Sequence, residues 1–334
     1  MQPNKKLITL SDNIKQITKL LSELVLQPRL NAIKWSAITK QTPNIKIGYP
    51  GQHLASLIAG MEGERSGARG NDLVDGSEVK SCSRIDQLDI CKKCGSPVAR
   101  LEVKCANCGS TDIDRKNDSK WLFGVRSEDE LNTLLHGVKR VLLVLGDYPN
   151  FDDGDFSTLR FQAFEIWPED KRNAHFGEIM KNYYFKIYLG HKKKSVEKTP
   201  APKNFWPYSY QFYLCNPIPT FACVVQNANS SPQVKILHYV DPGYNRSSLS
   251  SVVMPVEVLN DSEMALVFKR AKPAEIKQML KPAFKEDIRK FRSFPVSEKR
   301  EMILGIDEAL RAYLPLRDTD RIATAKLKYA RRMH

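Results

Sequence analysis

The chain has 334 residues, of which 42% are hydrophobic and 27% are charged, a composition typical of a globular protein and not of a disordered one. It carries 52 Lys and Arg against 38 Asp and Glu, a net charge of +14, and such a charge attracts polyanions such as nucleic acid or an anionic membrane surface. The sequence has no apolar run of the roughly 18 residues that a membrane span needs, and its start, MQPNKKLITLSDNIKQ, lacks the apolar core of a signal peptide. We therefore expect a nucleic-acid partner, no membrane association and a cytoplasmic location.

Residues 1–50 predict a helical scaffold. The stretch ITLSDNIKQITKLLSELVLQ has apolar residues at helical spacing, with Ser11 or Asp12 as a candidate N-cap. Pro50 and Gly51 precede a second, short apolar helix, HLASLIAGM, and the glycines of GMEGERSGARG end it.

Residues 69–80 read RGNDLVDGSEVK and predict a charged β-hairpin. The Asp-Gly dipeptide at positions 75 and 76 favours a tight turn between NDLV and SEVKS. Because residues i and i+2 of a strand share a face, Glu78 and Lys80 should point the same way while Val79 points into the core. A three-residue loop ending at Ser77 would bring Asp72 to the face of Glu78 and Lys80, whereas a two-residue loop would place Asp72 on the other face.

The polar groups of this hairpin are those that metal-dependent phosphodiester hydrolysis uses. The carboxylates of Asp72 and Glu78 and the carbonyl of Val79 are hard oxygen ligands for Mg²⁺, which completes its shell with water and phosphate. Lys80 can hold or help deprotonate the attacking water, and the metal stabilises charge at the phosphate. The acid-x-Lys triplet alone is weak evidence because it occurs six times in the chain, so the alternative is a surface hairpin with exchangeable charges.

The cysteine pairs that follow predict a zinc ribbon. Cys91-x-x-Cys94 and Cys105-x-x-Cys108 are each followed by glycine, which relieves the tight turn that brings two thiolates to one tetrahedral Zn²⁺. Four thiolates close the coordination shell, so we expect a structural and not a catalytic site. The alternatives are a pair of redox dithiols or an iron-sulfur site.

The middle of the chain alternates strands and helices, which argues for an α/β core. VKRVLLVLGDY is apolar enough for a strand buried on both faces, and STLRFQAFEIWP predicts a further strand before the helix HFGEIMKNYYFKIYLG. After the basic segment HKKKSVEKTPAPK come aromatic and β-branched stretches that predict more strands. From about Asp261 the chain is helical and basic.

The string RGNDLVDGSEVKS resembles the PD-(D/E)XK nuclease superfamily, whose members share an Asp, a short hairpin and then Glu-x-Lys. This string and LPLRDTDR, residues 314–321, also resemble the MamI-type of type II restriction endonucleases. The resemblance implies that Asp72, Glu78 and Lys80 form the catalytic triplet and that Asp72, Glu78 and the carbonyl of Val79 bind Mg²⁺. Asn71 stands where the superfamily often has proline.

Three other acids compete for roles in this site. Asp75 is an alternative first acid, and Glu64 or Glu62, expected at the end of the preceding helix, could add a metal ligand as an upstream Glu does in some relatives.

The resemblance implies a nuclease-like mixed sheet flanked by helices. With the patterns above it divides the chain into four expected regions: a helical scaffold at 1–50, a nuclease core at 51–190 with a zinc-ribbon insertion at 88–112, a basic linker and β-rich DNA-recognition region at 191–260, and a basic helical region at 261–334.

The leading hypothesis is a Mg²⁺-dependent, sequence-specific double-stranded DNA endonuclease of the restriction type, acting as a homodimer with one catalytic centre for each strand. The alternatives are a repair or structure-specific nuclease with the same chemistry, and a zinc-ribbon DNA-binding protein with an inert hairpin. Candidate contacts are phosphates for Lys192, Lys193, Lys194 and Lys203, and bases for Asn204, Gln211, Asn216, Gln226, Asn227 and Asn229.

Overall fold

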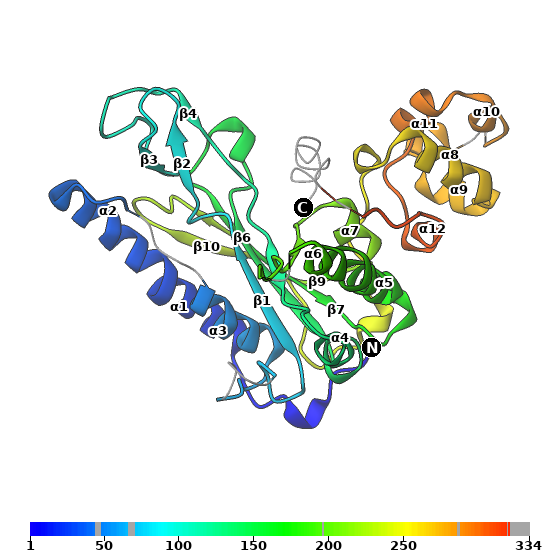
Figure 1. Ribbon diagram of the computed structural model, residues 1–334, viewed down its shortest axis with the longest axis horizontal. Helices are drawn as coiled ribbons and strands as arrows, with labels where there is room; N and C mark the ends of the chain where they lie inside the picture. The colour runs from blue at the N-terminus through cyan, green and yellow to red at the C-terminus, as the bar shows by residue number, and fades with distance from the viewer. Residues whose placement is uncertain (44–47, 66–70, 196, 286–287, 319, 321–334) are drawn as a thin grey trace.

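A computed structural model describes residues 1–43, 48–65, 71–195, 197–285, 288–318 and 320. Its core is a five-stranded sheet in the order β1-β6-β7-β9-β10, with helices on both faces (Figure 1). β1 is parallel to β6, and the remaining neighbours are antiparallel. The predicted mixed α/β architecture is therefore confirmed. The strands are β1 (Glu78–Ser83), β6 (Val141–Asp147), β7 (Leu159–Ile166), β9 (Ile218–Gln226) and β10 (Gln233–Tyr239).

Two of the three inner strands, β6 and β7, are buried at every residue. β6 is buried throughout, as its continuous apolar run predicted. β7 is buried throughout as well, although its sequence includes Arg160 and Glu165. Each of these charges has an ionic partner: Arg160 lies 2.7 Å from Asp147, and Glu165 lies 3.0 Å from Arg140. Since a buried charge is tolerated only when it is paired, these ion pairs allow β7 to occupy the middle of the sheet.

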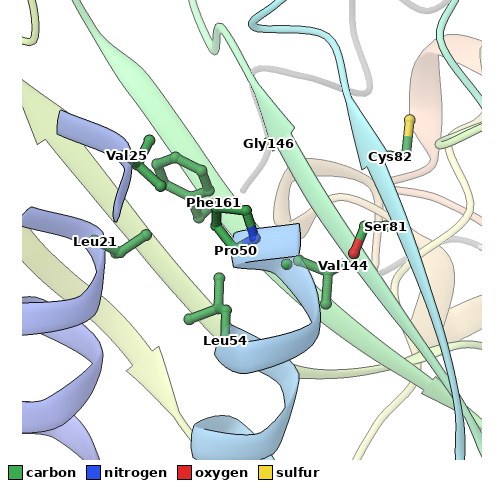
Figure 2. Close-up of a pocket in the computed structure, with 10 residues that line it drawn as sticks. Leu21, Val25, Pro50, Leu54, Ser81, Cys82, Val144, Gly146 and Phe161 are labelled. Atoms are coloured by element: carbon green, nitrogen blue, oxygen red, sulfur yellow. The ribbon is translucent and has the colours of Figure 1, made fainter. Parts of the chain in front are cut away.

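One face of the sheet is covered by α1 (Asn13–Leu21), α2 (Gln27–Thr39) and α3 (Gly48–Ala59), drawn in blue in Figure 1. Ile17 and Leu54 of these helices pack with Leu142 and Phe161 of the sheet. A pocket of about 10 Å³ remains between α3 and the strands, and Figure 2 shows that Pro50 and Leu54 border it. This volume is about the smallest that admits one water molecule.

Glycine at position 51 allows α3 to lie close to β1. A Cβ at Gly51 would overlap the hydroxyl of Ser81, so any other residue would push the helix away from the strand. Ser81 also borders the pocket in Figure 2. The close approach places the next residue of α3, Gln52, beside the segment that precedes β1.

The other face is covered by α4 (Glu128–Asn132), α5 (Ala174–Asn182), α6 (Leu189–Lys194) and α7 (Tyr210–Leu214), with β5 (Trp121–Phe123) paired to β8 (Lys203–Phe205). Aromatic side chains dominate this layer. Trp121 stacks on Phe212 at a centroid distance of 5.9 Å, and Phe123 meets Phe176 edge to face at 5.6 Å. Such pairs add about 0.5–1.5 kcal/mol each beyond the burial of their apolar area.

The described part of the C-terminal region is mainly helical between Asp261 and Arg311, where the sequence predicted helices; residues 321–334 of the predicted region lie outside the described residues. Buried Arg311 joins it to the rest of the molecule, because its guanidinium donates to the carbonyl of Tyr213 at 2.9 Å and to Oδ1 of Asn216 at 3.0 Å. In the part of the chain that the structure describes, no helix has the length and apolar character needed to cross a membrane. The helices are α8 (Asp261–Arg270), α9 (Pro273–Met279), α10 (Ile288–Ser293), α11 (Val296–Met302) and α12 (Glu308–Arg311).

Candidate active site

Glu78 and Lys80 lie on one face of β1, as their i, i+2 spacing predicted. The ammonium of Lys80 contacts the carboxylate of Glu78 and lies 5.9 Å from the centre of the Phe123 ring. Val79, between them, is buried in the core on the opposite side. β1 is an edge strand, and both charged side chains remain partly exposed, at 22% for Glu78 and 27% for Lys80. They can therefore be reached from solvent.

Asp72 joins this pair through the backbone of β1. Its Oδ2 accepts a hydrogen bond of 2.7 Å from the N–H of Val79, and its Oδ1 accepts one of 3.3 Å from the Gln52 amide. Burial raises the pKa of Asp72, and the charge of Glu78 raises it further, whereas the Val79 N–H bond and the charge of Lys80 lower it. The structure thus brings all three predicted residues together.

The turn between Asp72 and Glu78 differs from the predicted hairpin. The N–H groups of Asp72 and Leu73 both donate to the carbonyl of Ser77, at 3.0 and 3.2 Å, and Gly76 closes the turn with a φ of +83°. The segment before the turn does not pair with β1. It pairs with residues 62–64, while β1 pairs with β6. The reason is that the Asp72 side chain, and not its backbone, takes up the N–H of Val79 at the strand edge.

Asp75 points into the protein. Its Oδ2 lies 3.1 Å from the guanidinium of Arg140, and its side chain is 4% exposed. Its other oxygen accepts a bond of 3.1 Å from the N–H of Ser77. The carboxylate of Asp75 is therefore fully engaged by other groups of the protein.

Glu62 and Glu64 lie beyond the end of α3, where their backbones pair with the Asp72 segment. The N–H of Glu64 donates to the carbonyl of Asp72 at 2.9 Å, and both residues are exposed. Glu62 accepts a weak bond of 3.4 Å from the hydroxyl of Thr9. The backbones of Glu62 and Glu64 thus support the site. Among the described residues, neither carboxylate forms a group of three or more candidate metal ligands with Asp72 and Glu78.

The four cysteines form one cluster. Their sulfur atoms all lie within 4.8 Å of one another, and Gly95 and Gly109 adopt φ values of +73° and +69° in two equivalent turns. The donor set of four thiols in two such turns suits a structural zinc ion. The cluster belongs to a small sheet of β2 (Leu88–Cys91), β3 (Pro97–Ala99) and β4 (Ile113–Asp114).

Charged side chains attach this module to the core. Buried Asp89 receives two bonds of 2.7 Å from Arg100 and one of 2.8 Å from Arg115. The guanidinium of Arg100 lies 4.8 Å from the centre of the Phe151 ring, and that of Arg115 lies 4.9 Å from Phe156. The module is therefore packed against the β6–β7 connection, whose Phe151 and Phe156 contact the core of the main sheet.

Several residues expected at a DNA surface have structural roles instead. Lys203 is buried and donates to Gln211, and Asn216 is buried against Arg172 and Arg311. Asn229 accepts two hydrogen bonds from Arg29. The exposed lysines 192–194 remain available for phosphate contacts.

The late segment LPLRDTDR is structural in its described part, residues 314–318 and 320. Arg317 pairs with Glu263 of α8, with its Nε at 2.7 Å, and its guanidinium lies 3.7 Å from the centre of the Tyr210 ring. Buried Asp320 accepts a bond of 2.6 Å from the hydroxyl of Ser209 at the start of α7. The segment thus joins the C-terminal helices to the core.

The profile of the MamI restriction endonuclease family matches residues 34–257, more than half of the chain. The chain belongs to this family. The type II restriction enzyme MamI of Microbacterium ammoniaphilum is 41% identical over 56 residues, 17% of this chain and 18% of that enzyme. The chain thus matches less than a fifth of the length of this curated relative, and no solved structure matches it.

The MamI family match includes the segment from Asp72 to Lys80 and all four cysteines. It ends before α8, so the segment LPLRDTDR lies outside it. The candidate site and the four-cysteine module therefore both lie within the length of chain that the family profile matches.

Two residues of the candidate site were missed by the sequence analysis. Gln52 is a polar residue in a short apolar helix, and nothing local links it to Asp72. Arg140 stands just before a fully buried strand, where a charge is usually solvated. Its complete burial is a tertiary feature that only its partners, all distant in sequence, explain.

Proposed function

We propose that this member of the MamI restriction endonuclease family is a Mg²⁺-dependent, sequence-specific endonuclease that hydrolyses phosphodiester bonds of double-stranded DNA. The observation that carries the proposal is the convergence of Asp72, Glu78 and Lys80 at the accessible edge of β1. The family match supports DNA as the substrate, and the net charge of +14 supports a polyanionic partner.

Asp72, Glu78 and the backbone carbonyl of Val79 would hold the magnesium ion. The donor set fits the ion because it consists of oxygen atoms only, two of them from carboxylates. The raised pKa of Asp72 also fits, since a cation beside the two acids would favour their ionised forms. Bound there, Mg²⁺ would supply positive charge that stabilises the scissile phosphate.

The protein's own groups would orient the water. Lys80 would hold or help deprotonate the attacking water close to Glu78. As the oxygen of this water forms a bond to phosphorus, the bond between phosphorus and the leaving oxygen breaks; the proton lost by the water passes to solvent, and the leaving oxygen takes up a proton from solvent. Partial burial of Lys80 beside Phe123 limits the positions that its ammonium can adopt, which favours one attack geometry.

We propose Asp72, and not Asp75, as the first acid of the site. Asp72 is next to β1 and shares its environment with Glu78 and Lys80. Asp75 is 4% exposed and is engaged by Arg140. A metal ion at Asp75 would have to break this buried ion pair, which costs about 3–5 kcal/mol.

The cysteine cluster would hold a structural Zn²⁺. A shell of four thiolates leaves no open position for water or substrate. The proposed zinc therefore stabilises the module and takes no part in hydrolysis.

The test is a cleavage assay on plasmid DNA with and without Mg²⁺. We expect discrete fragments with wild-type protein and a loss of at least about 10³-fold in cleavage rate for Asp72→Asn, Glu78→Gln and Lys80→Met, because each removes a group of the hydrolytic step. Binding of DNA should persist in these variants, which fluorescence anisotropy measures.

The matched control is another acid-x-Lys triplet in the same chain. Asp114 and Lys116 form an exposed ion pair of 3.9 Å, so Asp114→Asn and Lys116→Met should leave cleavage unchanged. DNA binding without cleavage under all metal conditions would support a non-enzymatic binding protein, and preference for branched DNA would support a repair nuclease.

We propose a homodimer as the active form. Two coupled catalytic centres are expected to convert circular plasmid directly to linear molecules, without nicked circles.

A further inference from the structure

Arg140 holds the turn that carries the candidate active site, and it does so from inside the protein. Its side chain is fully buried, immediately before β6. Its Nε donates to the hydroxyl of Ser77 at 2.9 Å, and its guanidinium lies 3.1 Å from Asp75. Its own carbonyl accepts the N–H of Glu78 at 3.0 Å. The backbone and the side chain of one residue thus fix three residues of the segment 75–78.

Glu165 of β7 keeps this guanidinium in place. Its carboxylate lies 3.0 Å from Arg140 and 3.2 Å from Arg246, and it accepts the indole N–H of Trp167 at 3.0 Å. Burial acts to raise the pKa of Glu165, yet the charges of the two arginines hold it below its ordinary value. Glu165 is therefore an anion on a central strand of the sheet, and Arg140 is fixed to that strand.

Ser77 links Arg140 to Asp72 through hydrogen bonds. The hydroxyl of Ser77 is bound by Arg140, while its carbonyl accepts the N–H groups of Asp72 and Leu73. Asp72 is outside the regular strands of the sheet, whereas Glu78 belongs to β1. Without a fixed Ser77, the first acid could move while the second stays in place.

We propose that Arg140 is a positioning residue, which sets the distance between the carboxylates of Asp72 and Glu78 and thereby the affinity of the site for a divalent cation. This inference rests on the proposed function, because it assigns those two acids to one metal ion. Arginine suits the task because its planar fork can reach Ser77, Asp75 and Glu165 at once. Lysine, with a single ammonium, can replace only part of these contacts.

The experiment measures binding of Mn²⁺ to the full-length protein without DNA, by electron paramagnetic resonance of the free ion. We expect Arg140→Lys to weaken Mn²⁺ binding by about 10- to 100-fold, the usual effect of removing a residue that orients metal ligands. The half-saturating Mg²⁺ concentration for cleavage should rise in parallel, so that excess Mg²⁺ restores part of the rate.

Arg160→Lys is the matched control. Arg160 is equally buried and pairs with Asp147 between the same two strands. This pair lies at the end of the strands away from the turn, because Asp147 is the last residue of β6 whereas Arg140 precedes its first. Both variants should lose stability, which melting temperatures measure, while only Arg140→Lys should weaken Mn²⁺ binding. Equal weakening in both variants would overturn the proposal, because the effect would then reflect general loosening of the sheet.

The variant Asp72→Asn separates the positioning role of Arg140 from the proposed function. If Asp72→Asn binds Mn²⁺ as wild type does, the proposed metal site itself is wrong. If Asp72→Asn loses the ion while Arg140→Lys retains wild-type affinity, only the positioning role is wrong. Should Arg140→Lys fail to fold, Ser77→Ala removes one contact of the same guanidinium and is expected to weaken Mn²⁺ binding in the same direction; unchanged affinity in a folded Ser77→Ala would overturn the proposal.

Discussion

Asp72 and Asp75 stand three residues apart on one turn, yet they face different surroundings. Asp75 has a buried arginine as its partner, whereas Asp72 has the N–H of Val79 and lies near another carboxylate. Burial and the Glu78 charge raise the pKa of Asp72, so without a cation the folded protein keeps the proton of this carboxyl to a higher pH than the unfolded chain does. At neutral pH the ionised carboxylate of Asp72 therefore reduces stability.

The destabilising effect of the ionised Asp72 carboxylate gives a prediction for metal-free protein. Asp72→Asn should melt at a slightly higher temperature than wild type at pH 7, because the amide resembles the neutral acid. The difference should be complete above the raised pKa of Asp72 and disappear as the pH falls to the ordinary value of aspartate, where the acid is protonated in both folded and unfolded chains. Thermal melts of both proteins between pH 3 and pH 8, at pH intervals of about one unit, test this prediction.

Asp155 is a suitable control because its pKa is shifted in the opposite direction to that of Asp72. Although burial acts to raise the pKa of Asp155, hydrogen bonds from Asn150 and Ser157 hold it well below its ordinary value. Asp155→Asn should therefore destabilise at pH 7, and the loss should fade as the pH falls through the lowered pKa. If Asp72→Asn and Asp155→Asn changed the melting temperature at pH 7 in the same direction, the raised pKa of Asp72 would be contradicted.

At the scale of elements, the site depends on how closely α3 approaches β1. Gly51 of α3 faces Ser81 of β1 without room for a Cβ, and its neighbour Gln52 donates to Asp72. The parallel pairing of β1 with β6 leaves the other edge of β1 free for Asp72. A helix moved away from this edge would withdraw Gln52 from the site.

We expect Gly51→Ala to destabilise the protein by about 1–3 kcal/mol, because the added methyl group overlaps a side chain in a packed core. The matched change Gly190→Ala, in helix α6 where nothing lies within 4 Å, should be neutral or stabilise by up to about 1 kcal/mol, since alanine is the better helix former. Chemical denaturation measures both values. Similar stability of the two variants would show that α3 can adjust without cost.

At the scale of the whole molecule, the four-cysteine module is a separate small sheet joined to the core by contacts of its arginines with aromatic rings. Its interior consists mainly of cysteines and Val98, so the proposed zinc ion would take the place of an apolar core. Asp89 of the module holds the guanidinium of Arg100, which lies over Phe151 of the β6–β7 connection. This contact joins the module to the core of the main sheet, which has its own two clusters.

Removal of zinc should therefore unfold the module and leave the main sheet intact. After chelation, hydrogen exchange should rise sharply in residues 88–114 while β6 and β7 remain protected. The double change Cys105→Ser with Cys108→Ser should reproduce this pattern without chelator. Unchanged exchange in residues 88–114 after complete zinc removal would contradict a structural role for the metal.

Local patterns predicted those parts of the protein whose structure depends on nearby residues. The spacing of Glu78 and Lys80 placed both on one face, and the two Cys-x-x-Cys turns with their glycines indicated one four-cysteine cluster. The helix over residues 175–190 and the buried strand 141–147 followed from periodicity and apolar content, whereas the helix continues to Lys194 in a stretch predicted as a basic linker. The shape of the turn did not follow, because the Asp-Gly dipeptide fits a hairpin as well as the observed loop.

The sequence by itself determined the secondary structure of the core, the family and the residue types of the two candidate metal sites, because these depend on short-range spacing and composition. The tertiary structure alone decided that Asp75 pairs with Arg140, that Asp72 binds the edge of β1, and that Lys203 and Gln211 are buried. Each of these outcomes depends on partners more than five residues away, through burial and hydrogen bonds that no local pattern records. Which carboxylate is free to bind a metal ion is therefore a property of the fold.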